Sequence, residues 1–199
     1  TVHLREDRRH ILDKDLFKIV NLKNIHVNLE MAPTEAMLKI AKKAKPKFVC
    51  IVPERREEIT TEGGLNLKNN YLLIKKIIKS LKKSGIITTL FIEPNIQDVK
   101  RSKQLGAHCI EIHTGKFSNL FNLKKDFTKE FLNIRKNVYK ANTLGLEVHA
   151  GHGLTYQSAK EISKIRHIKE LNIGHFIISE AVFVGLKNVI LNFKKILSK

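Results

Sequence analysis

The sequence predicts an α/β fold, a (β/α)₈ TIM barrel of which the chain carries about seven of the eight βα units. Short runs of β-branched residues alternate with longer amphipathic stretches along all 199 residues. Regular repeats of this kind imply parallel strands, in an open doubly wound sheet or in a barrel. No glycine fingerprint follows the first strand, whereas polar and ionisable residues end nearly every strand. This combination favours the barrel.

The predicted elements follow one another in strand–helix order. We expect strands at residues 1–4, 25–29, 48–52, 87–92, 109–113, 146–150 and 170–173. We expect helices at residues 14–23, 33–43, 71–83, 96–105, 125–144, 156–165 and 180–197. Pro33-Thr34 and Pro94-Asn95 are typical of helix starts. Gly85, Gly106 and Gly145 are typical of helix ends.

The repeats predict a single domain over residues 1–199, incomplete at its N-terminal side. A complete barrel of this type has about 250 residues. The chain already starts inside a strand pattern at Thr1. We therefore expect a leading strand–helix unit to be absent from this chain.

Composition excludes several classes of protein. The formal net charge is +18, from 29 lysines and only 8 arginines among the basic residues. The lysines fall on the polar sides of predicted helices, so we expect solvated faces and no nucleic-acid partner, with polyanion binding as the alternative. No apolar run of membrane-spanning length and no signal-peptide pattern is visible, so no membrane partner is expected. Cys50 and Cys109 lie in apolar runs, which favours buried reduced thiols in the cytoplasm and no zinc site.

Ionisable residues at the first strand ends are the first candidate site. The segment TVHLREDRRHI gathers His3, Arg5 and His10 with acidic neighbours, which suits either an anionic group such as phosphate or a surface loop with compensated charges. Glu30 closes an apolar strand and is either a general base with a raised pKa or an ion-paired structural group. Glu111 shares a strand face with Cys109 and His113. It therefore points inward, as a catalytic carboxylate or with a buried Arg or His partner.

Two glycine–histidine turns follow the last two predicted strands. His152 stands between Gly151 and Gly153, where glycines allow a close approach to a ligand and hold the imidazole in a tight turn. Gly174-His175 repeats the pattern. Loops after the last strands are the usual phosphate-binding place in a barrel, and helix N-termini bind phosphate through free N–H groups.

Six motifs, in order along the chain, resemble the pyridoxine 5′-phosphate synthase family. They are TVHLREDRRHI, NLEMA, PERREEITTEGGL, EIHTG, AGHGLTY and LNIGH. The resemblance implies a (β/α)₈ barrel with additional helices that assembles into octamers. It also implies condensation of 1-deoxy-D-xylulose 5-phosphate with 3-amino-2-oxopropyl phosphate to pyridoxine 5′-phosphate, phosphate and water. No metal and no organic cofactor are implied.

The resemblance also assigns roles to residues of this chain. It makes His3 and Glu30 proton acceptors, His152 the proton donor and Glu111 a carboxylate that stabilises the transition state. It assigns Arg5, His10 and Thr60 to binding of the deoxyxylulose phosphate. It assigns Gly153, Gly174 and His175 to binding of the amino-ketone phosphate. A reaction with Schiff-base formation, dehydrations and ring closure requires several acid–base groups of different pKa.

The chain departs from the family pattern at its beginning. Family members carry an upstream strand and helix with substrate-contacting residues, and these are not in this chain. An inactive truncated remnant that keeps phosphate binding or subunit association is therefore the alternative to an active synthase.

Overall fold

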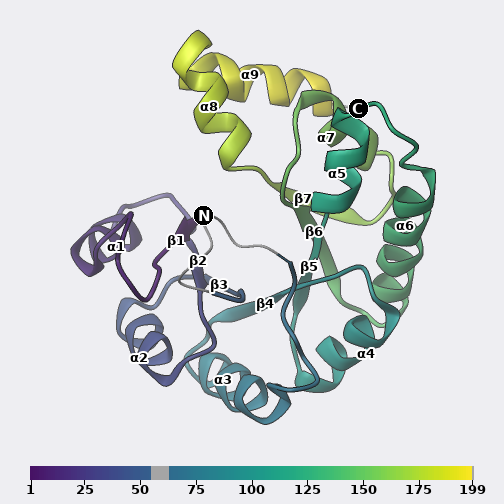
Figure 1. Ribbon diagram of the computed structural model, residues 1–199. Helices are drawn as coiled ribbons and strands as arrows, with labels where there is room; N and C mark the ends of the chain where they lie inside the picture. The colour runs from purple at the N-terminus through teal and green to yellow at the C-terminus, as the bar shows by residue number, and fades with distance from the viewer. Residues whose placement is uncertain (55–62, 199) are drawn as a thin grey trace. The chain divides into compact units, whose positions relative to one another are not determined.

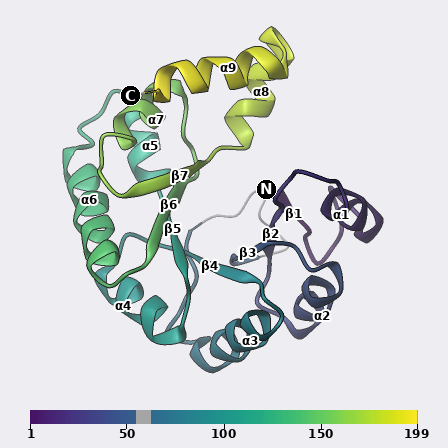
Figure 2. The ribbon, with the colours of Figure 1, turned by 180° about the vertical axis from the view of Figure 1, so that it is seen from behind.

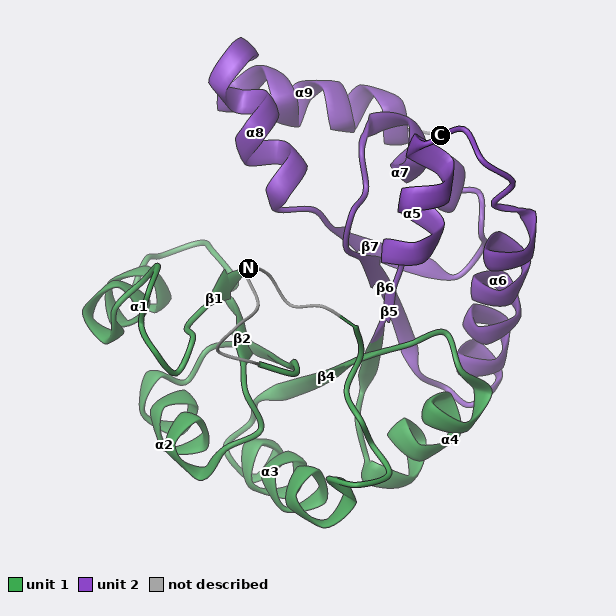
Figure 3. Ribbon diagram, in the orientation of Figure 1, with its two compact units in different colours: residues 1–110 green, residues 111–199 purple. Residues whose placement is uncertain are grey.

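The computed structural model describes residues 1–54 and 63–198, which form two compact units. Unit 1 comprises residues 1–110 and unit 2 comprises residues 111–199 (Figure 3). The boundary falls inside strand β5 (Cys109–His113).

Unit 1 alternates strands and helices from its first residues. Its elements are β1 (Val2–His3), α1 (Asp13–Val20), β2 (Asn28–Met31), α2 (Glu35–Ala44), β3 (Phe48–Ile51), α3 (Tyr71–Lys83), β4 (Ile87–Ile92) and α4 (Ile96–Leu105). Helices α1, α2 and α3 lie along one face of the strands β1 to β4, as views from both sides show (Figures 1 and 2). Capping side chains set the helix starts, since Thr34 accepts a hydrogen bond from the N–H of Met37 and Asn95 from that of Gln97.

The strands of unit 1 pair in parallel and in chain order. Val2 lies opposite Leu29 and His3 opposite Glu30. β2 then pairs with β3, and β3 with β4. The sheet order is β1 to β7 without a reversal, as predicted for a barrel and unlike a doubly wound sheet. Strand residues such as Val49 and Leu90 are fully buried together with Ile74 and Ile77 of α3, so the core lies between the sheet and its helices.

Unit 2 continues with the end of β5 and a similar alternation. Its further elements are α5 (Gly115–Asn122), α6 (Thr128–Thr143), β6 (Glu147–Gly151), α7 (Tyr156–Ile162), β7 (Ile168–Asn172), α8 (His175–Val184) and α9 (Leu186–Leu197). β6 and β7 pair in parallel with an irregularity at Val148 and His149. Four phenylalanines of α5, α6 and the turn between them cluster with ring centroids 4.9–6.1 Å apart, namely Phe117, Phe121, Phe127 and Phe131.

Most predicted elements are confirmed, and the differences have physical causes. The strands at 87–92 and 109–113 and the helices at 71–83 and 96–105 have the predicted bounds. β2 begins three residues later than predicted, because pairing with β3 starts at Asn28 and pairing with β1 at Leu29, while Ile25 is half exposed. The predicted helix 125–144 is preceded by a separate helix α5, and the last predicted helix is two helices that meet at Gly185, where φ is +80°.

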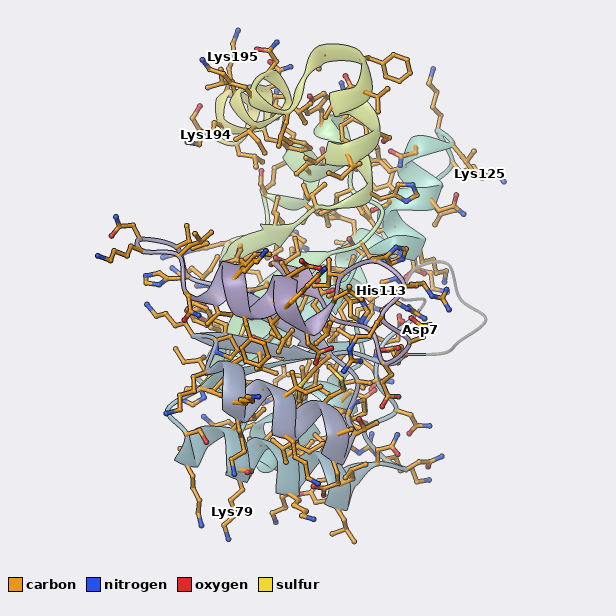
Figure 4. All side chains as sticks on the ribbon, turned by 90° about the vertical axis from the view of Figure 1, so that its left-hand side faces the viewer. Asp7, Lys79, His113, Lys125, Lys194 and Lys195 are labelled. Atoms are coloured by element: carbon orange, nitrogen blue, oxygen red, sulfur yellow. The ribbon has the colours of Figure 1, made fainter. Side chains whose placement is uncertain are left out.

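The structure also bears on the compositional predictions. The lysines on α2 and α3 are exposed, and Lys79, Lys125, Lys194 and Lys195 extend away from the ribbon (Figure 4). Cys50 and Cys109 are buried free thiols, as predicted. Within the described residues, no single helix is long and apolar enough to cross a bilayer. Only α8 and α9 taken together, bent by 119°, pass that test of length and composition.

Candidate functional site

In unit 1, the ends of three neighbouring strands bring an imidazole between two carboxylates. His3 and Glu30 are register partners on β1 and β2, and His3 Nδ1 lies 3.6 Å from Glu30 Oε2. Glu54, three residues after β3, approaches the other side of the ring, with its Oε2 3.6 Å from His3 Nε2. The pairing of the strands therefore brings together the two predicted proton acceptors and adds a third ionisable group that the sequence reasoning did not single out.

A buried arginine anchors this group of residues. The Arg5 side chain is 3% exposed and that of Glu54 is 4% exposed, with Arg5 Nε 4.0 Å from Glu54 Oε1. The backbone N–H of Glu6 donates to the same oxygen at 2.8 Å. Asp7 Oδ1 lies 3.6 Å from Arg5 Nε. A buried guanidinium is costly without partners, and these two nearby carboxylates offset its charge.

The surroundings shift the pKa values of this cluster in a consistent direction. Burial, followed by the charges of Arg5 and His10, lowers the pKa of His3 to about 4. Burial raises the pKa of Glu30 and also that of Glu54, for which the Glu6 N–H and Arg5 act in the opposite direction. At neutral pH His3 is therefore a neutral imidazole that can accept a proton. The raised pKa of Glu30 agrees with the general-base reading of the sequence, and its neighbour His3 is uncharged at neutral pH, so their contact is not an ion pair there.

The other basic residues of the first motif are largely neutralised by acidic neighbours. Arg8 Nε donates to Asp13 Oδ2 at 2.6 Å, and Arg9 donates to Asp7 Oδ2 at the same distance. His10 is exposed. Arg8 and Arg9 therefore belong to a loop with compensated charges, which was one of the two readings of this segment. Arg5, in contrast, is buried among strand ends. Thr60, the remaining predicted substrate-binding residue of this half, lies outside the described residues.

In unit 2, Glu111 of β5 is buried and held by an amide. Its side chain is 4% exposed, and the Nδ2 of Asn172, at the end of β7, donates to Oε2 at 2.7 Å. The inward direction predicted from the strand alternation is confirmed. Asn172 supplies one hydrogen bond to this carboxylate, a partner that the sequence did not indicate. A Cβ at Gly151 would overlap both Glu111 Oε1 and the Asn172 carbonyl, so only glycine lets β6 pass this carboxylate.

His152 follows β6 in a left-handed conformation, with φ at +86°. Its carbonyl accepts hydrogen bonds from Thr114 Oγ1 at 2.8 Å and Ser118 Oγ at 3.2 Å. Its ring meets the edge of the His113 ring, with centroids 4.8 Å apart. A Cβ on Gly115 would stand 2.6 Å from His113 Nε2 and 3.2 Å from His152 Cδ2. The imidazole of His152 is therefore held by the loop after β5 as well as by its own glycine-flanked turn.

The remaining predicted residues lie at the starts of two helices of unit 2. Gly153 precedes α7, which begins at Tyr156 behind an N-cap at Thr155, and Asn122 Nδ2 donates to the Gly153 carbonyl at 3.4 Å. Gly174 is the N-cap residue of α8, and His175 is its first residue. Both residues are exposed. These positions agree with glycine-bearing loops after the last two strands.

The sequence places Glu54 and His113 at strand ends but assigns no role to either of these two neighbours of the predicted acid–base residues. Glu54 follows β3 and lies in the motif PERREEITTEGGL, but only the packing shows that it reaches His3. His113 (labelled in Figure 4) lies two residues after Glu111 on β5 and therefore on the same face of the strand, which was the available signal for its place beside the site.

The fold and the strand-end residues define a class: α/β proteins built like TIM-barrel enzymes, with acid–base groups at the carboxyl ends of parallel strands. Solved structures share this fold at low sequence identity. The 3-hexulose-6-phosphate synthase of Salmonella typhimurium superposes with a TM-score of 0.63 at 13% identity, over 93% of this chain and 79% of that one. The tryptophan synthase A-subunit of Pyrococcus furiosus gives 0.58 at 12% identity, over 92% and 70%.

The sequence identifies the family within this class. The profile of the pyridoxal phosphate biosynthesis protein PdxJ matches residues 1–199, and the chain belongs to this family. It is 51% identical to the pyridoxine 5′-phosphate synthase of Pelagibacter ubique over 199 residues, which are 100% of this chain and 83% of that protein. The synthase of Sulfurihydrogenibium sp. is 50% identical over 99% of this chain and 82% of its own length. The resemblance seen in the six motifs is confirmed.

Proposed function

We propose that the chain is a pyridoxine 5′-phosphate synthase that performs a ring-forming condensation of two phosphorylated substrates. The observation that carries the proposal is the placing of His3 between two carboxylates at neighbouring strand ends, in a chain about half identical to synthases over its whole length. The substrates are 1-deoxy-D-xylulose 5-phosphate and 3-amino-2-oxopropyl phosphate, and the products are pyridoxine 5′-phosphate, phosphate and water. The residues supply acid–base groups, so the proposed reaction requires no cofactor and no metal.

The proposed roles follow from the environment of each side chain. His3 is neutral at pH 7 and accepts a proton from substrate, and Glu30 is a second acceptor whose raised pKa brings it nearer to neutral pH. His152 donates a proton to a departing oxygen. Glu111, buried and hydrogen-bonded to Asn172, stays in one orientation and stabilises positive charge as it develops on substrate.

Phosphate recognition is proposed at two places. In unit 1 we assign Arg5, His10 and Thr60 to the deoxyxylulose phosphate, since guanidinium and imidazole groups bind phosphate oxygens. In unit 2 we assign Gly153, Gly174 and His175 to the amino-ketone phosphate. The support is that α8 begins with free backbone N–H groups and an imidazole directly after Gly174.

The decisive experiment measures product formation from the two isotope-labelled substrates. Wild-type protein should form labelled pyridoxine 5′-phosphate, and Glu30→Gln should lose nearly all turnover while substrate phosphate binding stays within a few-fold. The assay is run on the 199-residue chain and on the same chain preceded by the strand–helix segment of its relatives. Phosphate binding without turnover in both forms would favour the inactive-remnant alternative.

We also propose a homo-oligomer, an octamer by resemblance, located in the cytoplasm and without nucleic-acid or membrane partners. Exposed apolar side chains on α8 support self-association, since Val182 is 79% and Phe183 is 83% exposed. Light scattering should give a lower mass for Phe183→Glu than for wild type. Leu72→Glu on α3, where the side chain is 81% exposed, is the matched control and should keep the wild-type mass. Buried reduced thiols support the cytoplasmic location.

A further inference from the structure

We infer that Glu54 is a positioning residue for His3, which it holds in the tautomer protonated at Nε2, so that Nδ1 is the nitrogen that accepts a proton. The role of Nδ1 as a proton acceptor in catalysis rests on the proposed function. The tautomer of His3 does not, because it can be measured in protein that is not turning over substrate. Neither the motifs nor the resemblance assigned a role to Glu54.

The geometry places one carboxylate on each nitrogen of the ring. Glu54 Oε2 is 3.6 Å from Nε2 and Glu30 Oε2 is 3.6 Å from Nδ1, both just longer than a hydrogen bond. Among the described residues, His3 Nε2 and Glu54 Oε2 are buried and have no other hydrogen-bond partner, so a small shift of either side chain satisfies both atoms. A neutral imidazole has one donor and one acceptor nitrogen, whereas an ionised carboxylate can only accept. The ring can therefore donate to only one of the two carboxylates. The other nitrogen keeps its lone pair.

The surroundings decide which carboxylate receives the ring N–H. Glu54 accepts the backbone N–H of Glu6 at 2.8 Å and has the Arg5 guanidinium 4.0 Å away. Both contacts favour its ionised form. Within the described residues, Glu30 accepts no hydrogen bond, and its 3.6 Å contact is with the neutral ring of His3. Among residues 1–54 and 63–198, the other titratable groups that act on His3 are Arg5, Asp7 and His10, all on its own segment. Glu54 is thus the stronger acceptor, and Nε2 carries the hydrogen.

This arrangement explains how His3 can act as a base although burial disfavours its charged form. When a substrate C–H or N–H bond breaks, its electron pair stays on the substrate and the proton goes to Nδ1. The imidazolium that forms lies against the Glu54 carboxylate, which stabilises the positive charge without taking the proton. Glu30, on the Nδ1 side, can share the proton afterwards. The proton count balances at each step.

The first test is ¹⁵N NMR of the histidine side chains in the full chain at pH 7, where protonated and unprotonated ring nitrogens have distinct shifts. For His3 we expect a protonated Nε2 and an unprotonated Nδ1. Glu54→Gln should produce a mixture of tautomers, because an amide can offer either a donor or an acceptor to the ring. A wild-type His3 protonated at Nδ1 would overturn the inference even if the synthase were active.

The second test is kinetic and separates positioning from binding. Glu54→Gln should lower kcat by about 10²-fold or more, in the direction of the loss seen when the carboxylate behind a catalytic histidine is neutralised. KM should change by less than a few-fold. Glu54→Asp keeps the charge and should recover part of the rate. Glu6→Gln is the control. This substitution removes an equal charge from the same region, but the Glu6 carboxylate accepts a hydrogen bond from Thr34 Oγ1 and does not contact His3.

The two tests distinguish a failure of the Glu54 inference from a failure of the proposed function. If wild type formed no pyridoxine 5′-phosphate but showed the expected tautomer, the proposed function would fail and the positioning would stand. If wild type were active while Glu54→Gln kept its rate and its tautomer, the inference would be wrong and the function would stand. Should Glu54→Gln fold poorly, the wild-type spectrum and the Glu54→Asp kinetics still decide.

Discussion

Acidification should destabilise this protein through His3, and His3→Gln should abolish that contribution. The pKa of His3 is 6.5 in an unfolded chain and about 4 in the fold. Between these values the unfolded chain binds a proton that the folded protein does not, so stability falls as pH falls. At about 1.4 kcal/mol per pH unit, the loss reaches about 3 kcal/mol at pH 4.

The assay is urea unfolding followed by circular dichroism at pH 7 and pH 4. Wild type should lose about 3 kcal/mol more than His3→Gln over this interval. The raised pKa values of Glu30 and Glu54 contribute with the opposite sign, since a folded state that binds protons more readily gains stability on acidification. The variant retains both carboxyls, so the comparison between the two proteins isolates the imidazole.

A matched control removes a histidine that lies at the surface of the same unit. His26→Gln should follow the wild-type curve, because the His26 ring is exposed. If His3→Gln lost as much stability as wild type, within about 0.5 kcal/mol, His3 would not be buried as a neutral group. In that case His3 would not be assigned as a base at neutral pH.

Three further predictions concern the second unit and the surface. His152→Asn should lower the synthase rate roughly 10²- to 10⁴-fold with little change in phosphate affinity, measured by steady-state kinetics and by phosphate binding. Gly115→Ala should destabilise by about 1–3 kcal/mol, because its Cβ meets two imidazoles, whereas Gly174→Ala, with open space around it, should cost much less in thermal unfolding. Nucleic-acid binding should be weak, independent of sequence and steeply reduced by salt, and tight sequence-selective binding at physiological ionic strength would contradict the interpretation of the lysines as solvated faces.

Much of the fold follows from local signals in the sequence. The strand and helix bounds at 87–92 and 96–105 were predictable because an apolar run, the Pro94-Asn95 start and the Gly106 end all agree. Helix α5 was missed because its glycine start and polar surroundings resemble a loop, and its stability comes from Phe117 packing among other phenylalanines. Such tertiary contacts have no periodic signature in the sequence.

The sequence predicted which residues form the site, but not which side chains contact one another. A carboxylate or histidine at a strand end signals its direction, which is why Glu30 and Glu111 were identified. Which group lies beside which depends on strand register and on how far a side chain reaches. Glu54 and Asn172 are each the partner of a predicted residue, and both come from strands distant in sequence. Partner choice therefore required coordinates.

The conformation of His152 gives a stability test of its functional importance. At φ +86° a side chain with a Cβ costs about 1 kcal/mol or more, which glycine avoids. His152→Ala and His152→Gly both lose the ring contact with His113, so they differ only in backbone strain and unfolded-state freedom. In ordinary conformations alanine is the more stable of the two by about 0.4–1 kcal/mol. Here we expect the reverse order in urea unfolding, with both variants inactive. Alanine equal to or more stable than glycine would show that the turn is unstrained, and the energetic argument that this position keeps its histidine for chemistry would be lost.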